Sequence, residues 1–449
     1  MSLSHPDQTS PSAESTHAPC ARAAMPSPLP SQAPDSRVGG HRVRPLAQAP
    51  ADTAPAWTAL ACAMALAVAL GVGRFAFTPL LPVMLHDGLI DIAGGGWLAS
   101  FNYAGYFVGA VTCAALRADP ARMIRGGLVA TVVLTAAMGL TDAFWAWAAL
   151  RAMAGVISAW TVVFASQWGL RQLARTGAVR WSGVIYTGPG VGILITGLAT
   201  RAVTHDGAAT GWLSFALLSA ALSALVWRRF AAERPTGDGR MGATSHGSAA
   251  SQLVPPSPSM RIARADAYWL CGLYSLAGFG YIMTATFLPV IARQALPAGS
   301  PWPDLFWPVF GAAIIPGALL GARLPAHWDN RLSLAICYVM QAAGIGLGIA
   351  LPTLAGFALG SLLVGLPFTA ITLFAMREAR RLHGERAAGL MGYATAAYGL
   401  GQIAGPLVAA PIAARTGSFS PALGLALAAL LLGAALLVAV ARAAGARER

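Results

Sequence analysis

Two arginines lie inside hydrophobic stretches of this sequence, where a full charge is energetically costly. Arg74 stands in the middle of GVGRFAFTPLLPVM (71–84), and Arg151 opens RAMAGVISA (151–159). A charged side chain near the centre of a membrane costs roughly 2.5–3.5 kcal/mol or more, so each arginine must face a cavity, a partner or a ligand. Since a guanidinium binds carboxylates through paired hydrogen bonds, these residues predict recognition of an anion.

Other polar side chains recur at helical spacing within apolar runs. Thr78 shares a helix face with Arg74, and Thr395, Tyr398 and Gln402 share another. Such stripes either contact a ligand or bond to neighbouring helices, where each hydrogen bond contributes about 0.6 kcal/mol on average. Both roles stay open. The candidate binding residues are Arg74, Thr78, Asn102, Tyr106, Arg151, Tyr274, Tyr281, Tyr398 and Gln402.

The composition is that of a membrane protein. Of the 449 residues, 56% are hydrophobic and 10% are charged, whereas a soluble chain has roughly 25% charged residues. All 30 basic residues are arginine, and the absence of lysine excludes a Walker A loop or a pyridoxal Schiff base on this chain. The arginines lie mostly between apolar runs, as topology signals do, so the net charge of +13 predicts no nucleic-acid partner. The five cysteines form no CxxC pair or Cys/His cluster, so we expect no disulfide, no metal and no cofactor.

Twelve apolar runs are long enough to cross a bilayer as helices of about 17–25 residues. They predict an all-α membrane protein with twelve transmembrane helices. The runs are 57–85, 95–116, 123–141, 144–170, 181–203, 211–229, 267–292, 304–323, 331–351, 353–376, 387–411 and 419–441. The expected domains are a disordered cytoplasmic tail (1–54), a six-helix bundle (55–229), a cytoplasmic linker (230–266), a second six-helix bundle (267–442) and a cytoplasmic tail (443–449).

The distribution of arginine predicts the orientation. Twenty-five of the 30 arginines lie in the two tails and in the loops on one side of the spans, and three lie in loops on the other side. Because basic residues accumulate in cytoplasmic loops, we expect both termini in the cytoplasm.

The two halves of the chain share a repeat. GVGRFAFTPLLPVM (71–84) aligns with GFGYIMTATFLPVI (278–291), with two glycines and a Leu-Pro-Val sequence in the same places at the end of each half's first span. Parallel halves of six spans joined by a long loop are typical of major facilitator transporters. The prolines Pro79, Pro82 and Pro289 lack a backbone donor and free a carbonyl one turn back, so we expect them to act in gating.

Over residues 57–442 the sequence resembles the major facilitator superfamily, and in detail the YbfB-type branch of bacterial transporters. The matching segments are GVGRFAFTPLLPVM (71–84), GLPFTAITLFAMREARRL (365–382) and TAAYGLGQIAGPL (395–407). The resemblance implies two pseudo-symmetric bundles, a substrate site between them, alternating access and a location in the bacterial inner membrane. We expect a monomer.

Weaker superfamily signatures indicate further gating residues. Gly188 and Pro189 resemble the Gly-Pro motif of exporters. The loop LRADPARMIR (116–125) resembles the motif that braces the inner gate, although the glycine of that motif is missing. The residues of the motif that remain are Asp119, Arg122 and Arg125.

The acidic residues bear on what the site binds. All seventeen lie in tails, in loops or at span edges, with Glu378 among those on the inner side, and no histidine lies at depth. Since a proton-coupled carrier usually needs such a group within the membrane, this pattern weakens proton coupling, although a coupling proton or ion stays open. Our hypothesis is a small organic anion whose carboxylate pairs with Arg74. For Arg151, hydrogen bonding to helix carbonyls is an equally good interpretation.

Three functions stay open on the sequence alone. The first is a secondary transporter of a small organic anion across the lipid bilayer. The second is a drug or metabolite exporter of the same fold, which the Gly-Pro element favours, and the third is a transporter-like receptor or scaffold. We do not expect an enzyme, because the sequence has no HExxH, no GxSxG and no acidic pair within the membrane.

Overall fold

Helices make up most of the chain in the computed structural model, which describes residues 55–113, 115–116, 118–203, 206–230, 258–325, 327–384 and 387–447. Within these ranges there is no strand. Eleven of the described helical segments are both long enough and apolar enough to cross a membrane. The predicted tail 1–54 and most of the predicted linker 230–266 lie outside the described residues.

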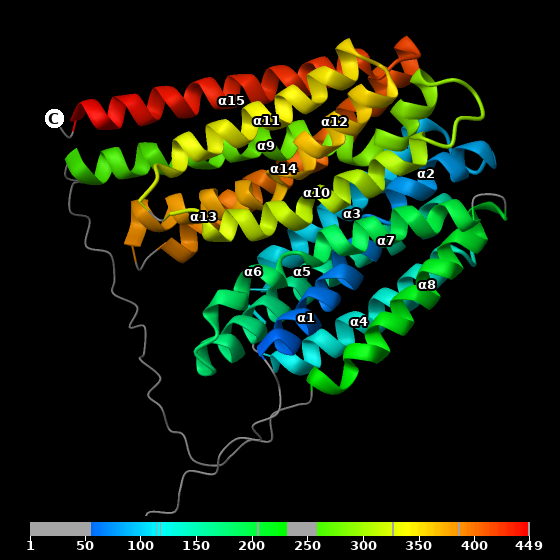
Figure 1. Cartoon of the computed structure of the whole chain (residues 1–449), viewed down its shortest axis with the longest axis horizontal. Helices are drawn as coiled ribbons and strands as arrows, with labels where there is room; N and C mark the ends of the chain where they lie inside the picture. Colours follow the sequence, from blue (N-terminus) through cyan, green and yellow to red (C-terminus); the bar gives the residue numbers. More distant parts are fainter. Residues whose placement is uncertain are drawn as a thin grey trace, which may run out of the picture. The chain divides into compact units, whose positions relative to one another are not determined.

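The first six spans form the N-terminal bundle (Figure 1). Its first span consists of α1 (Pro55–Leu66), the π-helical segment η1 (Ala67–Val72) and α2 (Phe77–His86). The other five spans are α3 (Ile92–Cys113), α4 (Pro120–Met138), α5 (Phe144–Arg175), then η2 (Val179–Trp181) with α6 (Ser182–Ile185) and α7 (Gly188–Val203), and α8 (Gly207–Val226) with η3 (Trp227–Phe230).

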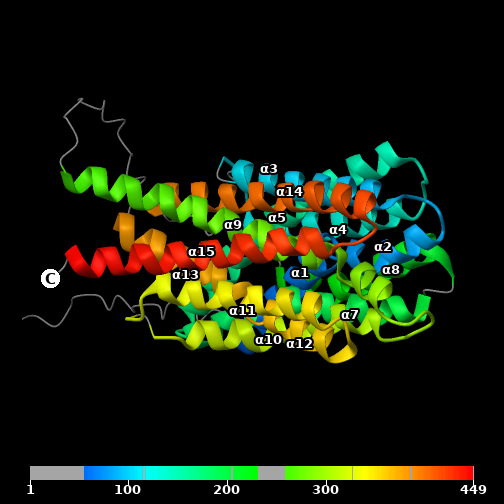
Figure 2. The ribbon, with the colours of Figure 1, turned by 90° about the horizontal axis from the view of Figure 1, so that it is seen from above.

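The last six spans form the C-terminal bundle. They are α9 (Pro258–Ala295), α10 (Pro303–Arg323), α11 (Asn330–Ala350), α12 (Leu354–Gly365) with α13 (Phe368–His383), α14 (Ala387–Thr416) and α15 (Ser420–Arg447). The two bundles meet where α3 lies beside α14 and where α7 lies beside α10 (Figure 2).

Successive spans run in opposite directions, so their connections alternate between two ends of the bundles. The loops around 118–119, 176–178 and 324–329 lie at one end, which we call the arginine-rich side. The loops around 87–91 and 140–143 lie at the other end, which we call the arginine-poor side.

Two of the observed helices extend past the predicted domain boundaries. Helix α9 begins at Pro258, inside the stretch that was predicted as linker, and α15 continues to Arg447, into the predicted tail. Both extensions carry polar residues that keep forming backbone hydrogen bonds beyond the apolar run, which hydropathy alone does not reveal. Helix α3 has 22 residues but is not among the eleven apolar segments, because its glycines and polar side chains lower its hydropathy.

Three spans are interrupted near their middle. Turns replace helix at residues 73–76 in the first span, 186–187 in the fifth and 366–367 in the tenth. Proline suits the first turn of a helix because its missing N–H would lack an intrahelical partner there. Pro79 and Pro189 occupy such positions in the first turns of α2 and α7, so each helix resumes one or two residues before its proline.

Close contacts between helices depend on glycine. In α3, Gly109 faces the backbone of α5, and a methyl group built on it would lie 2.6 Å from the carbonyl oxygen of Val156. At the seam between the bundles, a methyl group on Gly96 would lie 2.6 Å from the Cβ atom of Ala410. These helices therefore approach more closely than any larger side chain would allow.

We predict that Gly109→Ala destabilises the protein, because a methyl group cannot fit against the rigid backbone of α5. Overpacking of this kind costs about 1–3 kcal/mol. The matched control is Gly126→Ala in α4, where a methyl group would meet no atom within 4 Å. Melting temperatures of the two variants in detergent check this, and equal values for both would contradict the packing described here.

Candidate functional site

Arg74 lies at the seam between the bundles and is 4% exposed. Its Nη2 donates a hydrogen bond to Oε1 of Gln402 in α14, at 2.8 Å. The guanidinium carbon also lies 4.3 Å from the ring centre of Tyr106, 4.8 Å from that of Tyr103 and 5.2 Å from that of Phe75. Its Nε has no hydrogen-bond partner, and the ion pairs of the described residues include none to Arg74. An amide and three aromatic rings therefore surround this charge.

Gln402 connects Arg74 to a row of tyrosines in the C-terminal bundle. Its Nε2 donates to the hydroxyl of Tyr281 in α9. The ring of Tyr281 stacks on that of Tyr398 with ring centres 5.9 Å apart, and Tyr398 stacks on Tyr274 at 4.4 Å. The Tyr274 hydroxyl donates to Oγ1 of Thr372 at 3.0 Å. The row therefore runs from the buried charge toward the arginine-rich side.

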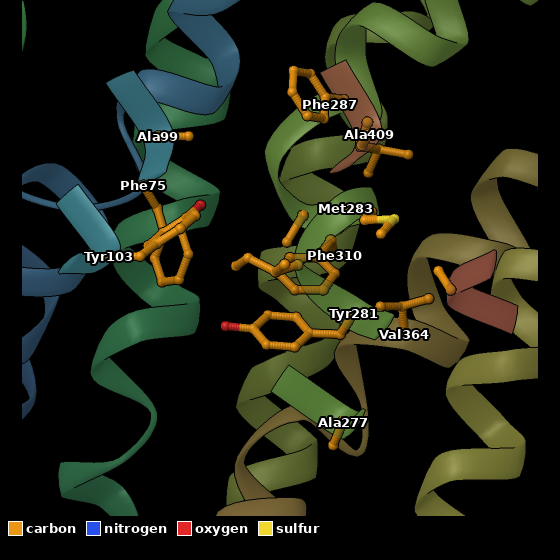
Figure 3. Packing of buried hydrophobic residues seen from close by; sticks show 14 of the residues in the cluster. Phe75, Ala99, Tyr103, Ala277, Tyr281, Met283, Phe287, Phe310, Val364 and Ala409 are labelled. Atoms are coloured by element: carbon orange, nitrogen blue, oxygen red, sulfur yellow. The ribbon is translucent and has the colours of Figure 1, made fainter. Parts of the chain in front are cut away.

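More aromatic rings complete the surroundings of this site. Figure 3 shows the ring of Tyr281 reaching from the C-terminal bundle toward Phe75 and Tyr103 of the N-terminal bundle. Phe368 in α13 contacts both Phe75 and Tyr281 edge-on, with ring centres at 6.3 and 5.3 Å. Trp307 in α10 lies 6.0 Å from Phe75. Side chains from both halves of the chain thus meet around Arg74.

The break in the first span frees backbone carbonyls beside Arg74. The N–H of Thr78 donates to the carbonyl of Phe75, three residues back, at 3.2 Å, rather than to that of Arg74. The next residue, Pro79, has no N–H to offer. The carbonyl of Arg74 is consequently left for another donor.

Arg151 supplies that donor from α5. Its Nη2 lies 3.1 Å from the carbonyl oxygen of Arg74, and its Nη1 lies 3.5 Å from that of Gly73. Asn102 contributes Nδ2, at 3.4 Å from the Gly73 carbonyl and 2.9 Å from the carbonyl of Arg151. Arg151 is 2% exposed and its guanidinium also lies 4.8 Å from the ring centre of Phe77. Both Arg151 and Asn102 hold the broken backbone, so their geometry matches the interpretation of bonding to carbonyls.

Hydrogen bonds join the two bundles on the arginine-poor side of Arg74. Oγ1 of Thr78 donates to the carbonyl of Ala285 at 2.9 Å, and the hydroxyls of Tyr103 and Thr286 share a hydrogen bond of 2.9 Å. Ser100 donates to the carbonyl of Ile403 at 3.1 Å. The seam is therefore closed by polar contacts on this side.

The predicted gating residues have contacts within their own bundle. The carboxylate of Asp119 accepts from the N–H of Ala121 at the start of α4, and it lies 3.7 Å from the guanidinium of Arg122. Arg125 donates to the carbonyl of Trp227 at 3.0 Å. Asp119 thus caps α4 and pairs with Arg122 in its first turn, whereas Arg125 joins α4 to η3, and a role of the three in gating stays a prediction.

The predicted gating glycine and prolines lie in different settings. Gly188 packs against the carbonyl of Ala63 in α1 and begins α7 together with Pro189. Pro82 lies inside α2 and Pro289 lies inside α9, which continues through it without a break. The repeat in sequence therefore does not extend to the interruption of the first span.

One acidic residue that the sequence puts at a span edge is buried. Glu378 lies near the end of α13, and its side chain is 3% exposed. Its oxygens accept from Nη2 and Nε of Arg381 at 2.7 and 2.9 Å, and from Nδ2 of Asn330 at 3.3 Å. Nε of Arg331 lies 3.8 Å from it. A buried carboxylate does exist, but it is paired within the C-terminal bundle and not with Arg74.

The same group of charges includes Asp329, at the start of α11. Its carboxylate accepts from Nη2 and Nε of Arg331 at 2.9 and 3.2 Å and from the N–H of the same residue. Burial raises the pKa of Asp329, but these hydrogen bonds outweigh burial and hold the pKa below its usual range. The loop before α11 is thus tied to α13 by alternating charges.

Some residues of the site were not selected as candidates from the sequence. Tyr103 stands three residues before Tyr106, so helical spacing could have included it. Phe75, Trp307, Phe368 and Thr372 offer no such signal, because they join the site through contacts between helices far apart in the sequence.

We predict that Glu378→Gln lowers the free energy of unfolding by about 1–3 kcal/mol. This is less than the 3–5 kcal/mol of a fully buried pair, because Arg381 is partly exposed and Arg331 keeps Asp329. Asp119→Asn is the matched control, since its pair with Arg122 is exposed and worth about 0–1 kcal/mol. Chemical unfolding in detergent micelles measures both, and a larger loss for Asp119→Asn would contradict this assignment.

Comparisons with known proteins agree with this architecture. Residues 66–438 match the family described as "Uncharacterised MFS-type transporter YbfB". The fold is similar to the crystal structure of a mutant of the nucleoside transporter NupG, with a TM-score of 0.65 and 13% sequence identity over 85% of this chain and 99% of that one. A search of curated protein sequences finds no match. The chain belongs to the YbfB-type family of major facilitator superfamily transporters, as its sequence predicted, and is not an enzyme.

Proposed function

We propose that this transporter carries a small organic anion, by alternating access of a site between the two bundles. The observation that supports the proposal most is the state of Arg74, which is 4% exposed and in contact with an amide and ring faces but with no carboxylate among the described residues. A buried charge without a counter-ion is costly, and a ligand that supplies one is bound correspondingly well.

The contacts of Arg74 suggest how an anion would bind. Oε1 of Gln402 occupies one donor of the guanidinium, and Nε is left without a partner. A carboxylate could replace the amide oxygen and accept two hydrogen bonds in parallel. Because such bonds are charge-assisted, they are roughly twice as strong as the bond to a neutral amide. Gln402 would then be free to keep its bond to Tyr281.

The exposure of the aromatic rings around Arg74 supports entry of the anion from the arginine-rich side in this state. Tyr103 and Phe75 are each 2% exposed, whereas Tyr106, Tyr398 and Phe368 are partly exposed. Tyr106 and Tyr398 lie closer than Tyr103 and Gln402, respectively, to the arginine-rich ends of their helices. With the hydrogen bonds on the arginine-poor side closed, an anion would reach Arg74 from the other side.

The orientation of the chain in the membrane indicates which side of the membrane the site faces in this state. The excess of arginine on one side supports a cytoplasmic position for that side and for both termini. The structure would then be open toward the cytoplasm, and transport requires a second state in which the contacts of Ser100, Tyr103 and Thr78 separate. Binding energy at Arg74 can favour that change only if the two states bind the anion differently.

We predict that Arg74→Gln abolishes transport of organic anions and that Arg74→Lys keeps a small part of it. Glutamine removes the charge, while lysine keeps a charge but cannot form the paired hydrogen bonds of a guanidinium. Counterflow of a panel of labelled organic acids into proteoliposomes measures this. The matched control is Arg171→Gln, an exposed arginine at the end of α5. Unchanged anion flux in Arg74→Gln would refute the proposal.

We also predict that a disulfide across the arginine-poor side stops transport. Gly96 and Ala410 face each other there, and a Cβ atom on Gly96 would lie 2.6 Å from that of Ala410. A disulfide needs about 3.5–4.5 Å between its Cβ atoms, so the double variant Gly96→Cys with Ala410→Cys can form one once the two helices move apart by about 1 Å. The variant is made in a chain whose native cysteines are replaced by serine. Oxidation should block counterflow and reduction should restore it, while each single variant is insensitive to both. Full transport by the oxidised protein would exclude opening on this side.

A further inference from the structure

The surface around Arg74 is unusually aromatic for an anion site. Three rings lie within 5.2 Å of the guanidinium carbon, and two further contacts of these rings lead to Trp307 and Phe368. Among the described residues, the side-chain group that bonds to the guanidinium is the amide of Gln402, which is bonded in turn to the hydroxyl of Tyr281. Arg151, Asn102 and Thr78 also lie nearby, but their donors are bonded to backbone carbonyls. The site thus offers one strong donor group and otherwise ring surface.

The scarcity of polar groups around Arg74 restricts which chemical groups the ligand can carry besides its carboxylate. A ligand with several hydroxyl or amino groups would lose hydrogen bonds to water that these rings do not replace, which disfavours sugar acids and polar amino acids. An aromatic ring gains from offset or edge-on contact with other rings, in addition to the apolar area that it buries. A saturated ring of the same size gains only from the area.

One partly exposed ring lies next to the charge, and a second contacts Phe75, whose own ring lies beside that charge. Tyr106 is partly exposed and its ring centre lies 4.3 Å from the guanidinium carbon of Arg74. Phe368 is also partly exposed, and it meets Phe75 and Tyr281 edge-on at 72° and 73°. The first ring comes from the N-terminal bundle and the second from the C-terminal bundle. A flat ligand between them would contact both halves of the transporter at once.

We infer that the anion is an aromatic carboxylate, with its acid group on Arg74 and its ring against Tyr106 and Phe368. The inference rests on the proposed function and makes it more specific, because it assigns the substrate class. Tyr106 and Phe368 then determine specificity, while Arg74 provides affinity for any carboxylate. The carboxylate takes the place of Oε1 of Gln402, which already accepts from Nη2.

Binding of matched acids to the purified full-length protein tests the inference. The probes are benzoate with cyclohexanecarboxylate, and 2-naphthoate with decahydronaphthalene-2-carboxylate, which differ within each pair in aromaticity but not in charge. Isothermal titration should show the aromatic member binding about two- to tenfold more tightly in each pair. Benzamide, which has the ring but no charge, should not bind measurably.

Two variants test whether Tyr106 and Phe368 cause the preference for aromatic acids. Tyr106→Leu and Phe368→Leu each keep an apolar side chain but remove the ring, so the ratio of affinities within a pair should fall toward one. Tyr106→Phe should keep the ratio. Tyr393→Leu is the matched control, because Tyr393 lies in α14 and is 74% exposed. Elution as a single peak in size-exclusion chromatography shows that each variant is folded.

The outcomes separate the inference from the proposed function. Equal affinities within both pairs, with loss of binding in Arg74→Gln, would overturn the aromatic preference and leave anion transport standing. Failure of all four acids to bind would overturn the inference. Binding that persists in Arg74→Gln would contradict both, because the acid group would then bind elsewhere.

Discussion

A buried guanidinium at the seam of two bundles is the constraint on which the site depends. Arg74 is 4% exposed, and the described residues give it an amide oxygen and aromatic rings rather than a carboxylate. Ring faces carry partial negative charge and stabilise a cation, but by less than a counter-ion does once water is excluded. The site is therefore stable enough to exist without ligand, yet it keeps most of its capacity to attract an anion.

The surrounding backbone is arranged to hold that charge in place. Turns at residues 73–76 release the carbonyls of Gly73 and Arg74, and Arg151 donates to both. The guanidinium of Arg151 is thus hydrogen-bonded to the backbone of Arg74, the other buried arginine. Under the proposed function the two arginines, at similar depth, would have different roles: Arg151 fixes the position of Arg74, and Arg74 keeps donors for a ligand. On the other side of the seam, the contact with Gln402, which also bonds to Tyr281, is the one that we propose an anion replaces.

The sequence predicted the fold well, since hydropathy reports directly on the membrane spans and the Leu-Pro-Val repeat on the division into two halves. Helix ends were predicted less well, because α9 and α15 continue in polar sequence. Arg74, Tyr281 and Gln402 were selected individually, but no pattern in one sequence could show that they touch. Phe368 was not selected at all, since it enters through packing between helices. The burial of Glu378 was not predicted, because a lone sequence does not show that Arg381 and Asn330 contact its carboxylate.

In the proposed cycle, Arg74 exchanges its bond to Gln402 for bonds to the acid group of the substrate. The most direct measurement is an experimental structure of the protein with a bound organic acid. The account predicts a carboxylate oxygen within hydrogen-bond distance of the Arg74 guanidinium, with Oε1 of Gln402 displaced from Nη2 and Arg151 still bonded to the carbonyls of Gly73 and Arg74. An acid bound elsewhere, with the bond between Arg74 and Gln402 intact, would contradict it.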